Sequence, residues 1–176
     1  MTTDVERAIA ELVTIGVVEH GAPLAALRDL VVSHARSLDG LDRCTGLETL
    51  SLIGCAVGDY EIVSRLAHLR VLVVENSDLT ELPWVTRLEL QVAVVRRNRV
   101  RDGAPLLGLP TIQSIDLTGN PLDAQTRSLA TAEAGRDRLV RVDDDDTADL
   151  NTRLADGDSG VVTYRREGSL WACATG

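Results

Sequence analysis

The chain has 176 residues, which is enough for one domain with a real core, and its formal net charge of −9 argues against a general phosphate-binding surface. All 18 cationic residues are arginine, and with two tyrosines, two tryptophans and no phenylalanine the core has to be aliphatic. Three cysteines cannot all pair internally, no apolar signal-type segment follows the N-terminus and no long apolar run is present, so we expect a cytoplasmic protein without a membrane span.

An amphipathic helix is predicted over residues 4 to 14. Thr3 and Glu6 have the spacing of a capping box, and apolar residues follow at helical intervals. We expect this helix to lie across the first coil of the repeat described next.

A pattern of eleven residues recurs over residues 47–57, 69–79, 90–100 and 112–122. The copies start 22, 21 and 22 residues apart, and each follows the order L-x-x-L-x-L-x-x-N/C-x-L. An earlier, degenerate copy is predicted over about residues 24–46. Periods of this length are typical of a solenoid, in which successive coils stack on one another.

Each position of the pattern has a predicted place in the coil. The fourth and sixth residues point into the solenoid, and the fifth points outward from a short strand. The ninth residue is buried where the chain leaves the sheet and has to satisfy backbone groups there. Its occupants are Cys55, Ser77, Asn98 and Asn120. We therefore interpret Cys55 as a structural residue at a coil turn.

In these features the chain resembles the leucine-rich repeat family, specifically the short 22-residue class of internalin-like proteins. The resemblance implies an α/β fold: a right-handed solenoid with a parallel concave sheet, an N-terminal helical cap and a C-terminal α+β cap. We place the cap helix and repeats in residues 1–125, with the clear copies in 47–123. Residues 126–176 form the C-terminal cap of the same structural domain.

The C-terminal region is predicted to contain a helix over 126–138 that is interrupted or ended near Gly135, a last strand of the sheet over 139–142 and a short helix over 146–155. Residues 161–165 and 170–174 then form a hairpin. Tyr164 and Trp171 are bulky, and we expect them to plug the open end of the core. The rival interpretation makes this region a separate small functional module.

No motif in the chain predicts catalysis, a cofactor or a metal. The acidic run at 143–146 and the pair Asp156 and Asp158 lack the full ligand set of a calcium loop and predict solvated turns. The three histidines have no zinc spacing, Cys44 falls in an apolar series and Cys173 has no recognisable histidine partner. We therefore expect a protein that is not an enzyme.

The one basic cluster is RRNRVR at residues 96–101. The repeat places Arg96 and Arg97 at the end of a strand on the open face, and Arg99 and Arg101 in the outgoing turn. The cluster is either a solvated rim or a contact for an acidic partner. Nucleic acid would need more positive surface and stacking aromatic residues.

The outward positions of the repeats predict a surface for a partner. Four valines form an apolar block with an isoleucine beside it and charged residues around it, the usual anatomy of a protein-binding patch. The predicted partner-binding residues are Ile53, Arg70, Val71, Val73, Glu75, Val92, Val94, Arg96, Arg97 and Asp116. The alternative is that valine here only reflects strand propensity.

We therefore expect a non-catalytic module that binds a partner protein through its concave face, in an adaptor, inhibitor or immunity-type role. Two alternatives stay open. The C-terminal segment SLWACATG is the functional part, as a modified tail or an enzyme fragment, or the chain is a self-associating scaffold. The sequence leaves the oligomeric state open.

Overall fold

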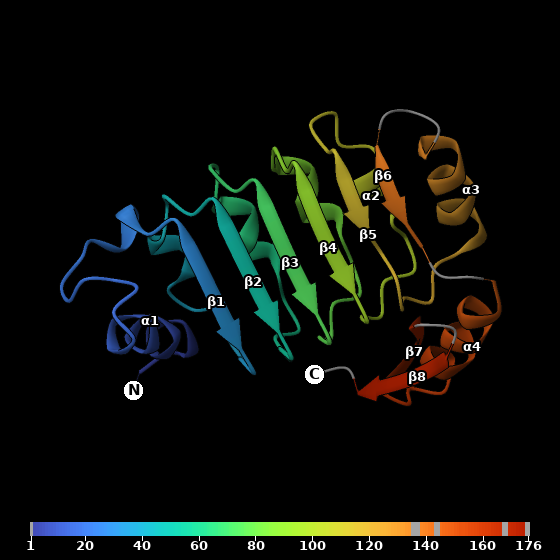
Figure 1. Cartoon of the computed structure of the whole chain (residues 1–176), viewed down its shortest axis with the longest axis horizontal. Coiled ribbons are helices and arrows are strands. Elements are labelled where there is room, and N and C mark those ends of the chain that lie inside the picture. The colour runs from blue at the N-terminus through green and yellow to red at the C-terminus, as the bar shows by residue number, and fades with distance from the viewer. Residues whose placement is uncertain (1, 135–137, 143–144, 167–168, 175–176) are drawn as a thin grey trace.

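The computed structural model describes residues 2–134, 138–142, 145–166 and 169–174. One parallel sheet runs through the repeats in the order β1-β2-β3-β4-β5-β6 (Figure 1). Its strands are β1 (Asp29–Ser33), β2 (Thr49–Ile53), β3 (Val71–Glu75), β4 (Val92–Arg96), β5 (Ser114–Asp116) and β6 (Leu139–Arg141). The predicted stacking of the repeats as parallel strands is therefore confirmed, and so is the last strand.

Short helical turns return the chain between strands and lie behind the sheet (Figure 1). They are η2 (Leu41–Arg43), η3 (Glu61–Arg65), η4 (Pro83–Arg87) and α2 (Ala104–Leu107), and a similar turn, η1 (Leu24–Ala26), precedes β1. The fourth and sixth repeat residues, such as Leu72 and Val74, are fully buried between the sheet and these turns. Adjacent strands keep a constant register, because each coil repeats the same alternation of inward and outward side chains.

The ninth-position residues form a buried ladder along the sheet. The amide of Asn98 donates to the carbonyls of Val74 and Arg96, both at 2.8 Å, and its oxygen accepts from the backbone N–H of Ser77 at 3.2 Å. The equivalent hydrogen bond between the two preceding coils is shorter: the backbone N–H of Cys55 donates to the Ser77 hydroxyl at 2.9 Å. Cys55 is fully buried, as its interpretation as a ladder residue predicted.

Helix α1 (Asp4–Thr14) covers the N-terminal end of the sheet and packs against β1 (Figure 1). Its predicted capping box is present: the backbone N–H of Glu6 donates to the Thr3 hydroxyl, and that of Thr3 donates to the Glu6 carboxylate, both at 3.1 Å. Val5 and Ala8 are the buried residues of the helix. At the other end, α3 (Ala124–Glu133) packs against α2 and β6. It begins two residues earlier than predicted because Asp123 caps it, accepting from the backbone N–H of Thr126 at 2.7 Å.

The rest of the chain is α4 (Asp145–Asp156) followed by the antiparallel hairpin of β7 (Val161–Arg166) and β8 (Ser169–Ala174). The hairpin prediction is confirmed. Thr163 of β7 is buried against α4, where its backbone N–H and hydroxyl both donate to the Asn151 side-chain oxygen. Among the described residues, no helix has the length and apolar character needed to cross a bilayer.

Asp4 fastens α1 to the first coil, which leads to a stability prediction. Its carboxylate accepts from the backbone N–H groups of Arg36 at 2.8 Å and Ser37 at 3.2 Å. The hydrogen bond from Arg36 is the main reason that the pKa of Asp4 is lowered from its ordinary value of 3.8. Asp4→Ala is expected to lower the free energy of unfolding by about 1 kcal/mol at neutral pH.

Since the pKa is lowered in the folded state, this contribution is complete above pH 3.8 and disappears as the pH falls through the folded-state value. Urea unfolding at a series of pH values should show the gap between wild type and Asp4→Ala closing in acid. Asp39→Ala, at an exposed position in the same turn, should show little gap at any pH. If the difference in unfolding free energy between wild type and Asp4→Ala persisted in acid, the ionised Asp4 carboxylate would not be its cause.

Candidate functional site

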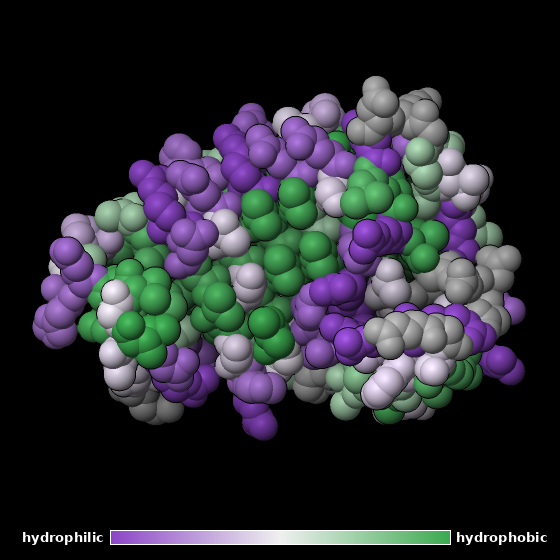
Figure 2. All heavy atoms as spheres, in the orientation of Figure 1, coloured by the Kyte–Doolittle hydropathy of each residue, from purple (hydrophilic) through white to green (hydrophobic). Residues whose placement is uncertain are grey.

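The concave face consists of lateral rows of outward side chains set by the strand register. One row places Thr49, Val71, Val92 and Ser114 side by side, and the next places Ser51, Val73, Val94 and Asp116 side by side. The two rows together bring the four valines into one block on the neighbouring strands β3 and β4. All four are partly exposed. Figure 2 shows this apolar block in the middle of the face, with hydrophilic residues on both sides.

Two further apolar residues on this face were not among the predicted contacts. Val31 lies in the same row as Ser51 and Val73, and Leu139 lies in the same row as Ser114. They are 47% and 53% exposed. Val31 belongs to the degenerate first copy, and Leu139 lies beyond the last clear copy, so the repeat pattern gave no outward position for either. Ile53, which was predicted, is also exposed.

The edge of the face at the strand N-termini carries ion pairs. Arg70 forms one with Glu89 at 3.1 Å, and its guanidinium also donates to the backbone carbonyl of Glu89 at 3.3 Å. Arg28 and Glu48 form the equivalent pair near β1 and β2 at 3.1 Å. Such exposed pairs add little stability, and they form a polar border beside the valines.

The edge at the strand C-termini is organised by Glu75. This carboxylate accepts from Arg96 Nε at 3.0 Å and from Arg97 Nη2 at 3.0 Å, and its own side chain is only 16% exposed. Asp116 lies 4.0 Å from Arg96 on the other side. Desolvation lowers the pKa of Arg96, but hydrogen bonding to Glu75 and the charges of Glu75 and Asp116 outweigh it and raise the pKa overall. The predicted arginines therefore meet carboxylates of their own chain.

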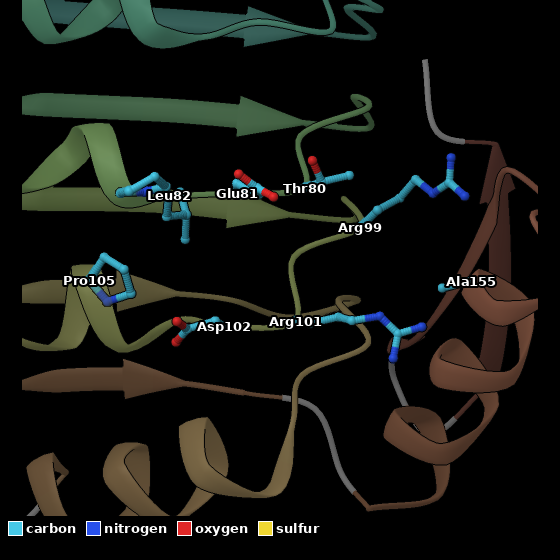
Figure 3. A pocket seen from close by; sticks show the side chains of 9 residues that line it. Thr80, Glu81, Leu82, Arg99, Arg101, Asp102, Pro105 and Ala155 are labelled. Atoms are coloured by element: carbon cyan, nitrogen blue, oxygen red, sulfur yellow. The ribbon is translucent and has the colours of Figure 1, made fainter.

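The other two arginines of the basic cluster hold the C-terminal segment in place. Arg99 forms an ion pair with Asp158, and Arg101 forms one with Asp156, the last residue of α4. Figure 3 shows both arginine side chains extending from successive outgoing turns toward α4, beside Ala155. A cavity of about 620 Å³ lies at this junction, lined also by Leu82 and Pro105.

The hairpin lies beside the carboxyl ends of the strands and not over the end of the core (Figure 1). The Tyr164 ring packs under the guanidinium of Arg97, with 4.7 Å from Cζ to the ring centroid, and the Cys173 thiol donates to the Asn76 side-chain oxygen at 3.2 Å. Trp171 pairs with Tyr164 across the hairpin and is 50% exposed. The expectation that Tyr164 and Trp171 plug the core is therefore wrong, because β6 and α3 already cover that end.

The thiols show no sign of activation. Cys44 and Cys55 are buried and Cys173 is partly buried, and desolvation raises the pKa of all three. The described part of the chain contains no group of three His, Cys, Asp or Glu side chains arranged to hold a metal ion. Of the acidic run, Asp143 and Asp144 lie outside the described residues.

Comparison with known proteins agrees with this architecture. No family model matches the sequence. No curated protein matches it either. Among solved structures, an internalin (inlF) of Listeria monocytogenes is similar at 17% identity and a TM-score of 0.57, over 82% of this chain and 54% of the internalin. An internalin C2 of the same species has 14% identity and a TM-score of 0.37, over 69% of this chain and 76% of its own.

The present chain thus spans about half the length of the inlF structure. At this identity the likeness concerns the fold alone. Together with the parallel sheet, the constant register and the buried ladder, it shows that the chain has the fold of a leucine-rich repeat solenoid.

Proposed function

We propose that this protein is a non-catalytic recognition module that binds a partner protein through its concave face. The observation that carries the proposal is the block of Val71, Val73, Val92 and Val94, which the register places together and leaves partly exposed. Contiguous exposed apolar patches often mark interaction sites, and an apolar centre within a polar border is the usual form of a protein interface.

The surroundings indicate what the partner presents. The four valines form a flat surface, and the repeats add no aromatic residue to it. The partner therefore contributes the larger apolar side chains. The hairpin adds Trp171, half-exposed beside the carboxyl-end border, and tryptophan is a frequent anchor of interfaces. The predicted contacts Ile53, Arg70, Glu75, Arg96, Arg97 and Asp116 form the border of the proposed interface.

The cysteines support a reducing compartment and a role without catalysis. All three are free, and their raised pKa values disfavour the thiolate that a nucleophile requires. We therefore place the protein in the cytoplasm, where it acts as an adaptor, an inhibitor or an immunity-type protein. The identity of the partner distinguishes these three roles.

Site-specific photo-crosslinking in cells of the source organism tests the proposed interface. A photoreactive phenylalanine at Val73 is expected to give one discrete adduct with another protein, and excess wild-type protein should compete it away. The same group at Arg65, exposed on η3 behind the sheet, should give no such adduct. An adduct from Arg65 alone, or an adduct with a second copy of this chain, would overturn the proposal.

A further inference from the structure

A second cavity, of about 470 Å³, lies where the carboxyl-end border of the concave face meets the hairpin. Four separate parts of the chain line it: the end of β4, the end of β5 with Thr118 after it, the outward residue of β6 and the first strand of the hairpin. Among its lining residues are five arginines, which are Arg96, Arg97, Arg141, Arg165 and Arg166. Among the described residues, Asp116 is the one carboxylate that lines it.

The positive charge of this cavity is only partly offset by the chain itself. Arg96 and Arg97 share the carboxylate of Glu75, and Asp116 lies 4.0 Å from Arg96. Neither Arg141 nor Arg166 forms an ion pair with any carboxylate in the described part of the chain. In a protein whose net charge is −9, a concentration of guanidinium groups marks a place for an anion.

Arg97 places a long side chain at a backbone position that favours glycine. Its φ is +54°, in the left-handed region, as are those of the equivalent residues His34, Gly54, Asn76 and Gly119 in other coils, so the repeat requires the conformation but not the arginine. Glycine and asparagine adopt this conformation readily, whereas a long side chain there is strained. A methyl group at Gly119 would meet Arg97 Cγ at 2.9 Å, so the neighbouring coil leaves room for the arginine. Strain of this kind is concentrated at functional sites.

We propose that this cavity binds a short acidic segment of the partner, with Asp or Glu carboxylates held by Arg141, Arg166 and the guanidinium groups of the β4 end. The inference rests on the proposed function and extends it by stating the chemistry of the partner. Val94 precedes Arg96 by two residues on β4, so both face the same side, and Arg96, which lines the cavity, lies next to the valine block. A ligand that fits both the cavity and the valine block has an apolar residue next to its carboxylates.

Arginine suits this role because its planar guanidinium binds a carboxylate through two parallel hydrogen bonds. The ion pairs with Glu75 hold the side chains of Arg96 and Arg97 in place, so these side chains lose less conformational entropy when a ligand binds. Arg141 and Arg166 are exposed and approach the ligand from β6 and β7. The cavity exists only when the hairpin is docked, because Tyr164, Arg165 and Arg166 form one of its walls.

Fluorescence anisotropy of a labelled oligoglutamate peptide tests the cavity on the full chain. Wild type is expected to bind the peptide, more weakly as salt rises. The double variant Arg141→Gln, Arg166→Gln should lose at least about tenfold in affinity, the effect of one or two charge-assisted hydrogen bonds. Its matched control, Arg43→Gln with Arg65→Gln on η2 and η3, has the same net charge and should bind as wild type does. Equal losses in both variants, or no binding by wild type, would overturn the inference.

A labelled single-stranded oligonucleotide provides the rival arm. If it binds more tightly than oligoglutamate and depends on the same two arginines, the site is for nucleic acid and the inference is wrong. The photo-crosslink at Val73 separates this outcome from the proposed function. An adduct at Val73 without oligoglutamate binding rejects the acidic-segment inference alone, whereas oligoglutamate binding without an adduct rejects the concave-face interface and leaves the cavity as an acidic-peptide site.

Discussion

Affinity for the partner protein is expected to fall at least about a hundredfold when Val73 or Val92 is replaced by aspartate. Both side chains are partly exposed on the concave face, so the variants should fold, at a cost of about 1 kcal/mol for aspartate in a strand. In the complex the new carboxylate would be buried among apolar groups without a partner, and that desolvation costs several kcal/mol. The partner is identified by the crosslink at Val73 and purified, and its titration against each variant gives the affinity. Far-ultraviolet circular dichroism checks the fold.

The choice of valine matters for this experiment. Val94 stands directly beside Asp116 in the register, so Val94→Asp would set two carboxylates side by side and disturb the sheet itself. Val73 has Ser51 and Val94 as neighbours, and Val92 has Val71 and Ser114, so neither substitution meets a like charge. These two are therefore the cleaner probes.

The matched control is Val17→Asp, the same chemical change at a residue that is 67% exposed near α1 and away from the sheet. It should leave the affinity within about twofold of wild type. If Val73→Asp and Val92→Asp bind the partner as well as Val17→Asp does, the concave face is not the interface.

The repeat could be predicted because each coil faces the same physical problem. A residue such as Leu72 or Leu50 has to fill the space between the sheet and the returning turn, and the ninth residue has to satisfy the backbone where the strand ends. Spacing alone therefore placed the strands, the valine rows and the role of Cys55. The C-terminal helix boundaries also came out within a few residues, including the end of α3, which lies at Glu133 and was expected near Gly135.

Placement of the hairpin could not be predicted, because it depends on contacts between residues far apart in the sequence. The strand pattern of 161–174 indicates a hairpin, but nothing in it indicates that Asp156 and Asp158 will meet Arg101 and Arg99. Arg99 and Arg101 were therefore placed in the outgoing turn with no contact inside the chain, whereas they pair with the C-terminal segment. The cavity arginines Arg165 and Arg166 were missed for the same reason.

Arg141 is a different case, since its position was within reach of the sequence. Residues 139–142 were expected to join the sheet, and Asp116 pairs with Arg141 in the register. Extending the outward row by one strand would have placed Arg141 beside the predicted border. That extension would not have shown that the hairpin lies opposite Arg141 and encloses a cavity there.

The ladder predicts the largest loss of stability from a single polar substitution. Asn98→Ala is expected to lower the free energy of unfolding by about 3 kcal/mol, because it removes the donors to the carbonyls of Val74 and Arg96 and the acceptor of the Ser77 N–H. The Arg96 carbonyl keeps the backbone N–H of Asn76, at 3.2 Å. Asn98 is fully buried, so water does not replace the amide at low cost. In a protein of this size the loss corresponds to a fall of about 10 °C in Tm, measurable by calorimetry or circular dichroism.

Two further variants determine whether the hydrogen bonds are the cause. Asn98→Asp keeps an acceptor for Ser77 but loses both donors and buries a charge, so it should destabilise at least as much as alanine does. Asn76→Gly removes a neighbouring asparagine whose side chain, within the described residues, accepts a hydrogen bond from Cys173 alone, and it keeps the left-handed backbone that Asn76 adopts. It should change the stability by less than about 1 kcal/mol. If Asn98→Ala were no worse than Asn76→Gly, the stacked coils would be held by their apolar core alone, and the strand ends that position Arg96 and Arg97 would need another explanation.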